Sequence, residues 1–140
     1  MGISYDENNV FAKILAGKMP CIKVYEGQHS LAFMDIMPQT QGHVLVISKE
    51  PAVTIYDLSH EAALACMQTL QTVGKALEKA MNVDGSSVFQ LNGKVAGQSV
   101  PHFHFHIIPG SLLNLTGHAE TVEDKDKLQS IANKIIAHLD

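Results

Sequence analysis

The sequence predicts an α+β fold: a five-stranded antiparallel sheet with one long packed helix and short terminal helices. Five short runs have the composition or alternation of strands, at residues 22–26, 30–36, 43–47, 87–91 and 102–108. One long apolar stripe at helical spacing runs from residue 59 to about residue 81. This mixture is typical of an α+β domain. A length of 140 residues is near the usual size of one domain, so we expect a single domain over 1–140.

The first predicted element is a short helix over residues 10–16. Asn9 is a typical N-terminal cap, because its side chain can accept a hydrogen bond from a free backbone amide, and Gly17 is a typical stop. Phe11 and Ile14 share one face of this helix, which predicts that both pack into the core.

A hairpin and a central strand are predicted next. Residues 22–26 alternate, a Gly-Gln turn follows, and residues 30–36 return with Asp35 as the polar residue at the end. The strand over 43–47 is almost entirely apolar after His43, which predicts a central position in the sheet.

The long helix is predicted to begin after Ser59 and to pack across the sheet. Its apolar stripe consists of Leu64, Met67, Leu70, Val73, Leu77 and Ala80 or Met81. Residues 82–85 close the helix, and 87–91 form the fourth strand. Near the C-terminus, Thr121 to Asp124 has a capping-box pattern, and apolar residues then recur at helical spacing to Leu139. This last helix is expected to cover apolar surface on its own chain or on a partner.

The fifth predicted strand carries three of the chain's eight histidines, His102, His104 and His106, in a run between two prolines. Alternate side chains of a strand share a face, so the histidines are expected to point one way and the intervening apolar residues the other. Their Cα atoms would lie about 6.6 Å apart in succession, which lets the imidazoles converge on one phosphate or metal ion.

The segment before the histidines favours a phosphate. Gly97 allows close backbone approach, Gln98 and Ser99 add side-chain donors, and Asn92 begins the turn. A zinc site usually needs carboxylates that orient the imidazoles, and the chain has no Asp or Glu between residues 84 and 120. A neutral imidazole is also a competent nucleophile, and the middle histidine is best placed to act as one. An ordinary imidazole nucleophile predicts a rate that falls as the pH drops from about 8 to 5.

Composition argues against several classes of protein. A net charge of −4, with no long run of Lys or Arg, gives no electrostatic footprint for a nucleic-acid polymer. No apolar run is long enough for a membrane span, and the N-terminus lacks the pattern of a signal peptide. Cys21 and Cys66 form no CxxC pair, so we expect reduced thiols in the cytoplasm.

The segment from Gly97 to Ile108 resembles the signature of the histidine triad (HIT) superfamily, in which three histidines alternate with apolar residues after Gly-Gln-Ser or Gly-Gln-Thr. Residues 31–36, 42–47 and 92–98 are similar to other HIT segments, those of bacterial HIT or Hint-like nucleotide-binding proteins. The resemblance covers about the first 110 residues. It implies a single HIT domain in which 111–140 form a variable C-terminal loop and helix.

The resemblance implies a homodimeric nucleotidyl hydrolase or transferase that acts on purine nucleoside phosphoramidates or related derivatives, dinucleoside polyphosphates included. His104 would form a covalent nucleotidyl-histidine intermediate, and His102 and His106 would line the phosphate oxygens. His43 would support the triad from beneath, and Ser99 would donate to the developing charge. The implied nucleotide-binding residues are Phe11, Ile14, Asp35, Ile36, Leu45, Asn92, Gly97, Gln98, Ser99 and Val100.

Individual roles in this set also follow from the resemblance. Asp35 would accept ribose hydroxyls, Phe11, Ile14 and Ile36 would contact the base, and Asn92 would contact the sugar or phosphate. No cofactor is expected. Some bacterial relatives bind a structural zinc ion, but Asn9, Ala12 and Pro51 occupy the corresponding ligand positions here, so no metal is expected either.

Two other readings stay open at this point. The histidine row could belong to a metal-binding or metal-storage protein, which the missing carboxylates argue against. The site could also belong to a nucleotide-binding regulatory or interaction module in which turnover is incidental. A complete set of His43, Asn92, Gln98, Ser99 and the triad favours the enzyme, because a module that only binds needs no nucleophile.

Overall fold

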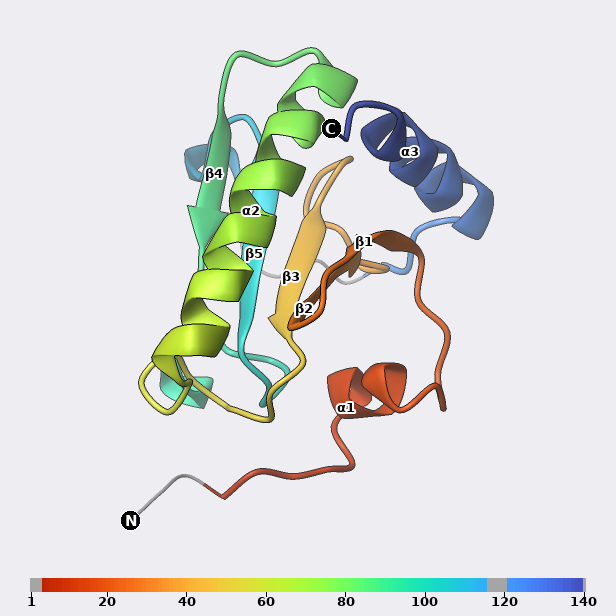
Figure 1. Ribbon diagram of the computed structural model, residues 1–140. Helices are drawn as coiled ribbons and strands as arrows, with labels where there is room; N and C mark the ends of the chain where they lie inside the picture. Colours follow the sequence, from red (N-terminus) through yellow and green to blue (C-terminus); the bar gives the residue numbers. More distant parts are fainter. Residues whose placement is uncertain (1–3, 116–120, 140) are drawn as a thin grey trace.

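The computed structural model describes residues 4–115 and 121–139. Five antiparallel strands form one sheet in the order β1-β2-β3-β5-β4 (Figure 1), which confirms the predicted α+β class. The elements in chain order are α1 (Val10–Leu15), β1 (Lys23–Glu26), β2 (Ser30–Met34), β3 (Val44–Ser48), α2 (His60–Met81), β4 (Ser86–Phe89), the 3-10 turn η1 (Lys94–Ala96), β5 (His104–Pro109), the 3-10 turn η2 (Leu112–Asn114) and α3 (Lys125–Ala137).

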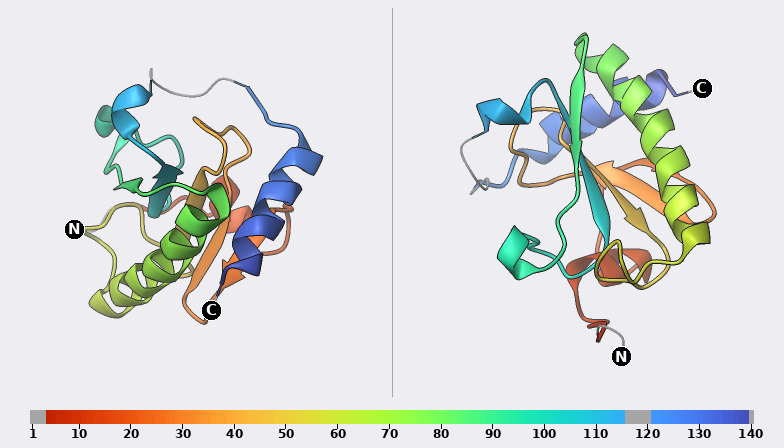
Figure 2. Two further views of the ribbon diagram at one scale, coloured as in Figure 1. Left: turned by 90° about the horizontal axis from the view of Figure 1, so that it is seen from above. Right: turned by 90° about the vertical axis from the view of Figure 1, so that its left-hand side faces the viewer.

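The central strands β2 and β3 are buried on both faces of the sheet. Figures 1 and 2 show α2 and α3 together over one face. That face contributes Ala32, Met34, Val44 and Val46 to the main core. The alternate residues of the same strands, Leu31, Phe33, Leu45 and Ile47, form a second core with Phe11 of α1 on the opposite face. Strand β3 lies in the middle of the sheet and is buried along its whole length, as its apolar sequence predicts.

Four strands are shorter than their sequence patterns predict. β1 begins at Lys23 rather than residue 22, β2 ends at Met34 rather than residue 36, and β4 ends at Phe89 rather than residue 91. β5 begins at His104, so His102 precedes the strand. The reason at β5 lies in the backbone: the amide of His102 donates to the Val100 carbonyl and the amide of Phe103 donates to the Ala52 carbonyl, away from the sheet.

Helix α2 begins and ends as predicted, but only part of its predicted apolar stripe faces the core. Leu70, Val73 and Leu77 are buried as predicted. Ser59 Oγ accepts a hydrogen bond from the Ala62 amide, and Asn82 ends the helix in the left-handed conformation. Leu64 and Met67 lie on the outer face, 60% and 43% exposed. The face against the sheet instead carries several small residues, and its buried members are Ala62, Cys66, Thr69, Leu70, Val73, Ala76 and Leu77.

Helix α3 covers its own chain. It buries Leu128, Ile131 and Ile135 in the main core, beside α2 and β1. The predicted cap was wrong by three residues, because Asp124 rather than Thr121 accepts the hydrogen bond that begins the helix. Of the predicted C-terminal loop and helix over 111–140, residues 116–120 and 140 lie outside the described residues, and 112–114 form η2. None of the helices in the described ranges is both long and apolar enough to cross a membrane.

Gly42 leads into β3 and offers a test of how tightly this junction is packed. Its φ is +89°, and a Cβ there would lie 3.2 Å from Met81 Cγ, 3.2 Å from Pro109 Cγ and 3.3 Å from Leu77 Cδ1. Gly42→Ala is therefore expected to lower the free energy of unfolding by about 1–3 kcal/mol, measured by urea denaturation.

The matched control for this substitution is Gly74→Ala. Gly74 lies inside α2, and a Cβ there would meet no atom within 4 Å. Alanine at this position is expected to raise the free energy of unfolding by about 0.5–1 kcal/mol, because glycine is entropically costly in a helix. Equal stability of the Gly42→Ala variant and the wild-type protein would show that the junction is looser than the distances indicate.

Candidate active site

The candidate site lies on the sheet face that α1 covers. In the pairing of β3 with β5, Ile47 is opposite His104 and Leu45 is opposite His106. These two histidines therefore share a face with the second core, whereas Phe105 and Ile107 face α2. The predicted alternation of histidine and apolar side chains is correct for the strand itself. His102 joins the site from the segment before β5.

His104 has a defined tautomer. Its Nδ1 lies 2.7 Å from the backbone oxygen of His102, and a carbonyl oxygen only accepts, so Nδ1 carries the proton. The lone pair is then on Nε2. Burial lowers the pKa of His104 to about 4, and the side chain is only 4% exposed. The sequence predicts a rate that falls as the pH drops from about 8 to 5. Because the pKa is lowered, His104 instead loses its nucleophilic form only below about pH 5.

His102 is held at both ring nitrogens. Its Nε2 donates to the backbone oxygen of Ser48 at 2.7 Å, which leaves Nδ1 as an acceptor in the neutral ring. The hydroxyl of Tyr5 lies 2.6 Å from Nδ1 and therefore donates to it. His102 is fully buried, and burial lowers its pKa, so the neutral form dominates near pH 7.

The tautomer of His106 is determined by two hydrogen bonds, one from Gln39 to His43 and one from His43 to His106. The backbone amide of Gln39 donates to His43 Nδ1 at 3.1 Å, so the proton of neutral His43 is on Nε2. His43 Nε2 lies 2.9 Å from His106 Nδ1 and donates to it. The remaining nitrogen of neutral His106, Nε2, is then a donor. Phe89 stacks on the His106 ring, with centroids 4.4 Å apart and planes 8° from parallel.

His43 and Asp35 form the base of this arrangement. Burial, with a smaller repulsion from His104, lowers the pKa of His43 to about 4. The Asp35 carboxylate lies 3.6 Å from His43 Nε2 and accepts a hydrogen bond from the Met37 amide at 2.9 Å. Burial raises the pKa of Asp35 to about 6. A carboxylate therefore does accompany the histidines, contrary to the prediction from the sequence around the triad, because Asp35 reaches them from the end of β2.

Asp35, His43 and His106 are close enough to raise the question of a metal ion, because their donor atoms all lie within 4.8 Å of one another. A metal on His43 Nε2 would require the proton to move to Nδ1, where it would face the N–H of Gln39. The backbone thus favours a proton on Nε2 over a metal there. The donor set fits a hydrogen-bonded relay better than a metal centre.

The loop before the triad is folded by the side chains that were expected to bind phosphate. Gln98 Oε1 accepts from the Gly93 amide at 2.6 Å, and Gln98 Nε2 donates to the Val53 carbonyl at 2.7 Å. Asn92 Oδ1 accepts from the Ile55 amide at 2.9 Å. Both amide side chains thus brace the loop in this structure. Gly97 has a φ of +101°, which favours glycine, and Ser99 is exposed.

The predicted base-contacting residues fall into two groups. Phe11 and Leu45 are buried in the second core, and Ile14 and Val100 pack against it half-buried. Ile36 lies outside that cluster and is 52% exposed, beside Asp35. The edge of the Phe11 ring contacts His104, with centroids 5.0 Å apart. The apolar cluster therefore adjoins the candidate nucleophile.

Three groups at the site were not predicted from the sequence. Phe89 pairs with His106 across β4 and β5, a contact that only the strand register reveals. The Ser48 carbonyl belongs to the backbone and has no sequence signal. Tyr5 is separated from His102 by 97 residues and lies before the first helix, so no local pattern marks it.

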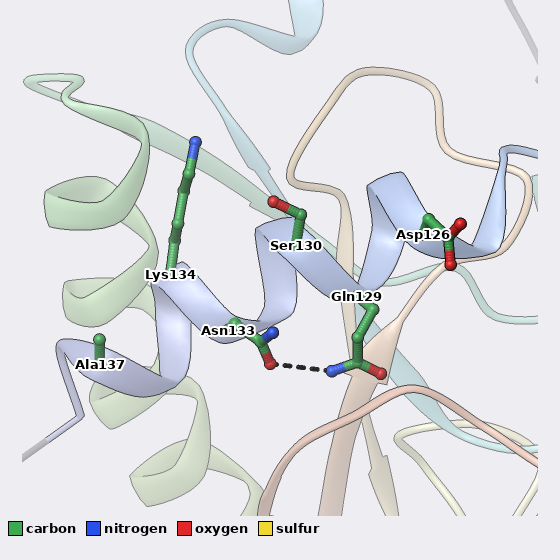
Figure 3. Close-up of a pocket in the computed structure, with 6 residues that line it drawn as sticks. All are labelled: Asp126, Gln129, Ser130, Asn133, Lys134 and Ala137. Atoms are coloured by element: carbon green, nitrogen blue, oxygen red, sulfur yellow. Dashed lines mark hydrogen bonds between the residues drawn. The ribbon is translucent and has the colours of Figure 1, made fainter.

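A polar depression elsewhere on the surface lacks the features of a catalytic site (Figure 3). Its lining residues are Asp126, Gln129, Ser130, Asn133, Lys134 and Ala137, all on the exposed face of α3. Gln129 and Asn133 hydrogen-bond to each other at 2.9 Å. A single helix face cannot enclose a ligand, so the histidine cluster remains the candidate active site.

The chain is similar to known proteins in both sequence and structure. A family model described as the HIT domain matches residues 16–112. Protein hit of Bacillus subtilis is 37% identical over 139 residues, 95% of each chain. An adenosine 5′-monophosphoramidase of Schizosaccharomyces pombe is 46% identical over 100 residues, 71% of this chain and 72% of that protein. The crystal structure of a Hit-like protein from Bartonella henselae matches with a TM-score of 0.91 and 38% identity, over 98% of this chain and 100% of that one.

Proposed function

The chain belongs to the HIT family, and we propose that it is a nucleotidyl hydrolase or transferase that acts through a covalent nucleotidyl-histidine intermediate. The proposed substrates are purine nucleoside phosphoramidates or related nucleotide derivatives. Hydrolase chemistry on nucleotides is supported by the family and by the phosphoramidase relative. The observation that carries the proposal is the tautomer of His104, whose Nδ1–H is engaged by the His102 carbonyl and whose Nε2 holds the lone pair.

The proposed reaction has two displacements at phosphorus. The Nε2 lone pair of His104 attacks the α-phosphorus, the bond to the leaving group breaks, and its electron pair departs with the leaving atom. Water then attacks the same phosphorus, the P–N bond to His104 breaks, and its electron pair returns to Nε2. The water loses one proton to solvent, which balances the proton that the leaving group takes up, and the nucleoside monophosphate is released. The backbone amide and the exposed hydroxyl of Ser99 are the proposed donors to the phosphoryl oxygens. The amides of Gly97 and Gln98, which were also predicted to be donors, instead donate to the Lys94 and Gly93 carbonyls at 2.9 and 3.1 Å.

His106 is proposed to act on the leaving group. As the bond breaks, negative charge gathers on the leaving nitrogen or oxygen. The Nε2–H of His106 is placed by the chain from Gln39 through His43, and it can donate to that atom. The Phe89 ring against His106 restricts rotation of the imidazole. A fixed donor of this kind costs little reorganisation during the reaction.

The nucleoside is proposed to lie beside the apolar cluster. The base would contact Phe11, Ile14 and Val100, with Ile36 at the edge. Asp35, at the end of β2, would accept the ribose hydroxyls. Asn92 and Gln98 would contribute by holding the phosphate loop in shape rather than by donating freely.

Assembly and domain extent are also proposals. Leu64 and Met67 on the outer face of α2 supply apolar surface that a second copy could cover in a homodimer. The packing of α3 into the main core supports a single HIT domain over 1–140, in which 111–140 are the variable part. Both cysteines are free thiols, as expected in a reducing compartment, and a cytoplasmic location stays a prediction.

Chromatographic release of adenosine monophosphate from an adenosine phosphoramidate tests the proposed activity. Turnover that follows enzyme concentration is expected. Nucleotide binding without any release would favour the alternative in which the protein is a binding module.

The pH dependence of kcat and KM should separate two groups. His104 and His43 have pKa values lowered to about 4, so their neutral forms persist, and kcat should stay level from pH 8 to about 5 and fall below it. The histidines titrate as a coupled set, so the fall in kcat below about pH 5 reports the whole set rather than one histidine. Asp35 has a pKa raised to about 6, and a ribose hydroxyl binds the ionised form better. KM should therefore rise as the pH falls through about 6.

Asp35→Asn is the matched control for the pH experiment. This variant should bind nucleotide more weakly, and its KM should no longer change between pH 7 and 5. Its kcat should still fall below about pH 5, as in the wild-type protein. A wild-type kcat that falls several-fold between pH 7 and 6 would contradict a neutral His104 with a lowered pKa.

A further inference from the structure

We propose that Tyr5 is a positioning residue for this site: its hydroxyl, together with the Ser48 carbonyl, holds the His102 ring in one tautomer and one orientation, and the His102 carbonyl in turn orients the His104 nucleophile. The kinetic part of this inference rests on the proposed function. The tautomer itself can be measured without any substrate.

The direction of the Tyr5 hydrogen bond follows from its neighbours. Ser48 contributes a backbone oxygen 2.7 Å from His102 Nε2, so that nitrogen must carry a proton. The opposite nitrogen of the neutral ring is then a pure acceptor, and the phenol 2.6 Å away is the donor. The Tyr5 ring also contacts the imidazole edge-on, with centroids 5.6 Å apart. Burial raises the pKa of Tyr5, which keeps the phenol protonated near neutral pH.

The position of His102 depends on its side chain as well as on its backbone. His102 precedes β5, and its backbone amide donates to the Val100 carbonyl rather than to a neighbouring strand. Its ring, which is fully buried, is anchored by Tyr5 on one side and Ser48 on the other. The carbonyl of this same residue accepts the Nδ1 proton of His104. The ring contacts therefore act together with the Phe103 amide, which donates to the Ala52 carbonyl at 2.7 Å, to hold the peptide group that orients the nucleophile.

Loss of the Tyr5 hydroxyl would leave a buried acceptor on His102 without its donor. Such a group is destabilised by its lost hydrogen bond, and the ring then keeps only its contact with Ser48, so it can rotate more freely. The other tautomer would present a lone pair to the Ser48 oxygen, which is repulsive. Added motion of the ring would loosen the backbone at His102, and the Nε2 lone pair of His104 would lose part of its fixed direction.

Tyr5→Phe tests the proposal, with Tyr56→Phe as the matched control. Tyr56 is 84% exposed in the loop before α2, so the control should behave as the wild-type protein. Tyr5→Phe is expected to lower kcat about ten-fold with KM within about two-fold. In ¹⁵N-histidine-labelled, ligand-free protein, the His102 Nδ1 resonance should move toward the value of a nitrogen without a hydrogen bond, and only in Tyr5→Phe.

A double-mutant cycle shows whether Tyr5 acts through His102. In a His102→Ala background, Tyr5→Phe should change kcat less than two-fold, because the acceptor is already gone. An unchanged His102 Nδ1 resonance in Tyr5→Phe would overturn the proposal. So would a ten-fold effect that persists without His102, or an effect confined to KM, since either would place Tyr5 on the substrate. The resonance is read without turnover, so failure of the proposed function would be seen separately.

Discussion

Replacing His104 by alanine is expected to lower the turnover of an adenosine phosphoramidate by about 10⁴-fold or more, because no other residue offers the lone pair that forms the covalent bond. The side chain is buried and its Nε2 is the nitrogen left free by the His102 carbonyl. Steady-state release of adenosine monophosphate measures the effect. His60→Ala is the matched control, since His60 is exposed at the start of α2 and should keep full activity.

A chemical rescue distinguishes a missing nucleophile from a damaged fold. His104→Gly leaves a space where the imidazole stood, and added imidazole should restore part of the release rate in proportion to its concentration. His104→Ala activity above about 1% of wild type would contradict the assignment of the nucleophile.

Replacing His106 by alanine is expected to lower the rate on a phosphoramidate by about 10²- to 10³-fold, the usual cost of one fixed donor to developing charge. An amine is a poor leaving group, so it depends strongly on the Nε2–H that the His43 relay places. The same variant should lose much less activity on a nitrophenyl ester of adenosine monophosphate, whose leaving group needs little stabilisation.

The ratio of the two losses is the informative quantity for His106. Equal losses of activity on the phosphoramidate and on the nitrophenyl ester would show that His106 binds the phosphate oxygens of both substrates and does not act on the leaving group. Phe89→Leu offers a milder companion change, because it removes the ring that stacks on His106 and keeps the donor. The Phe89→Leu variant should also lose more activity on the phosphoramidate than on the nitrophenyl ester, and both losses should be smaller than those of His106→Ala.

Local patterns were sufficient to predict much of the fold. The alternation of histidine and apolar residues identifies one face of a strand, since side chains of a strand alternate, and His104 and His106 do share that face. The apolar run of β3 predicts its central position because a strand covered on both faces has no polar side. Asn9 and Ser59 cap the helices that they were predicted to cap.

The remaining features depend on contacts between distant segments. Asp35 reaches His43 only because β2 and β3 are neighbours in the sheet, so a search for carboxylates near the triad in sequence missed it. The stripe of α2 was misjudged because small residues allow the helix to approach the sheet, which turns Leu64 outward. Tyr5 lies next to His102 through the path of the N-terminal segment, which no periodicity reports.

Intact mass spectrometry of a single turnover tests the central claim most directly. Wild-type protein and His104→Ala would be mixed with less than one equivalent of an adenosine phosphoramidate and examined without acid, which would cleave a P–N bond. We predict a transient gain of one adenosine monophosphate in the wild-type protein and none in the variant. Release of product with no adduct at any time, or an adduct that persists in His104→Ala, would contradict covalent nucleotidyl transfer through His104.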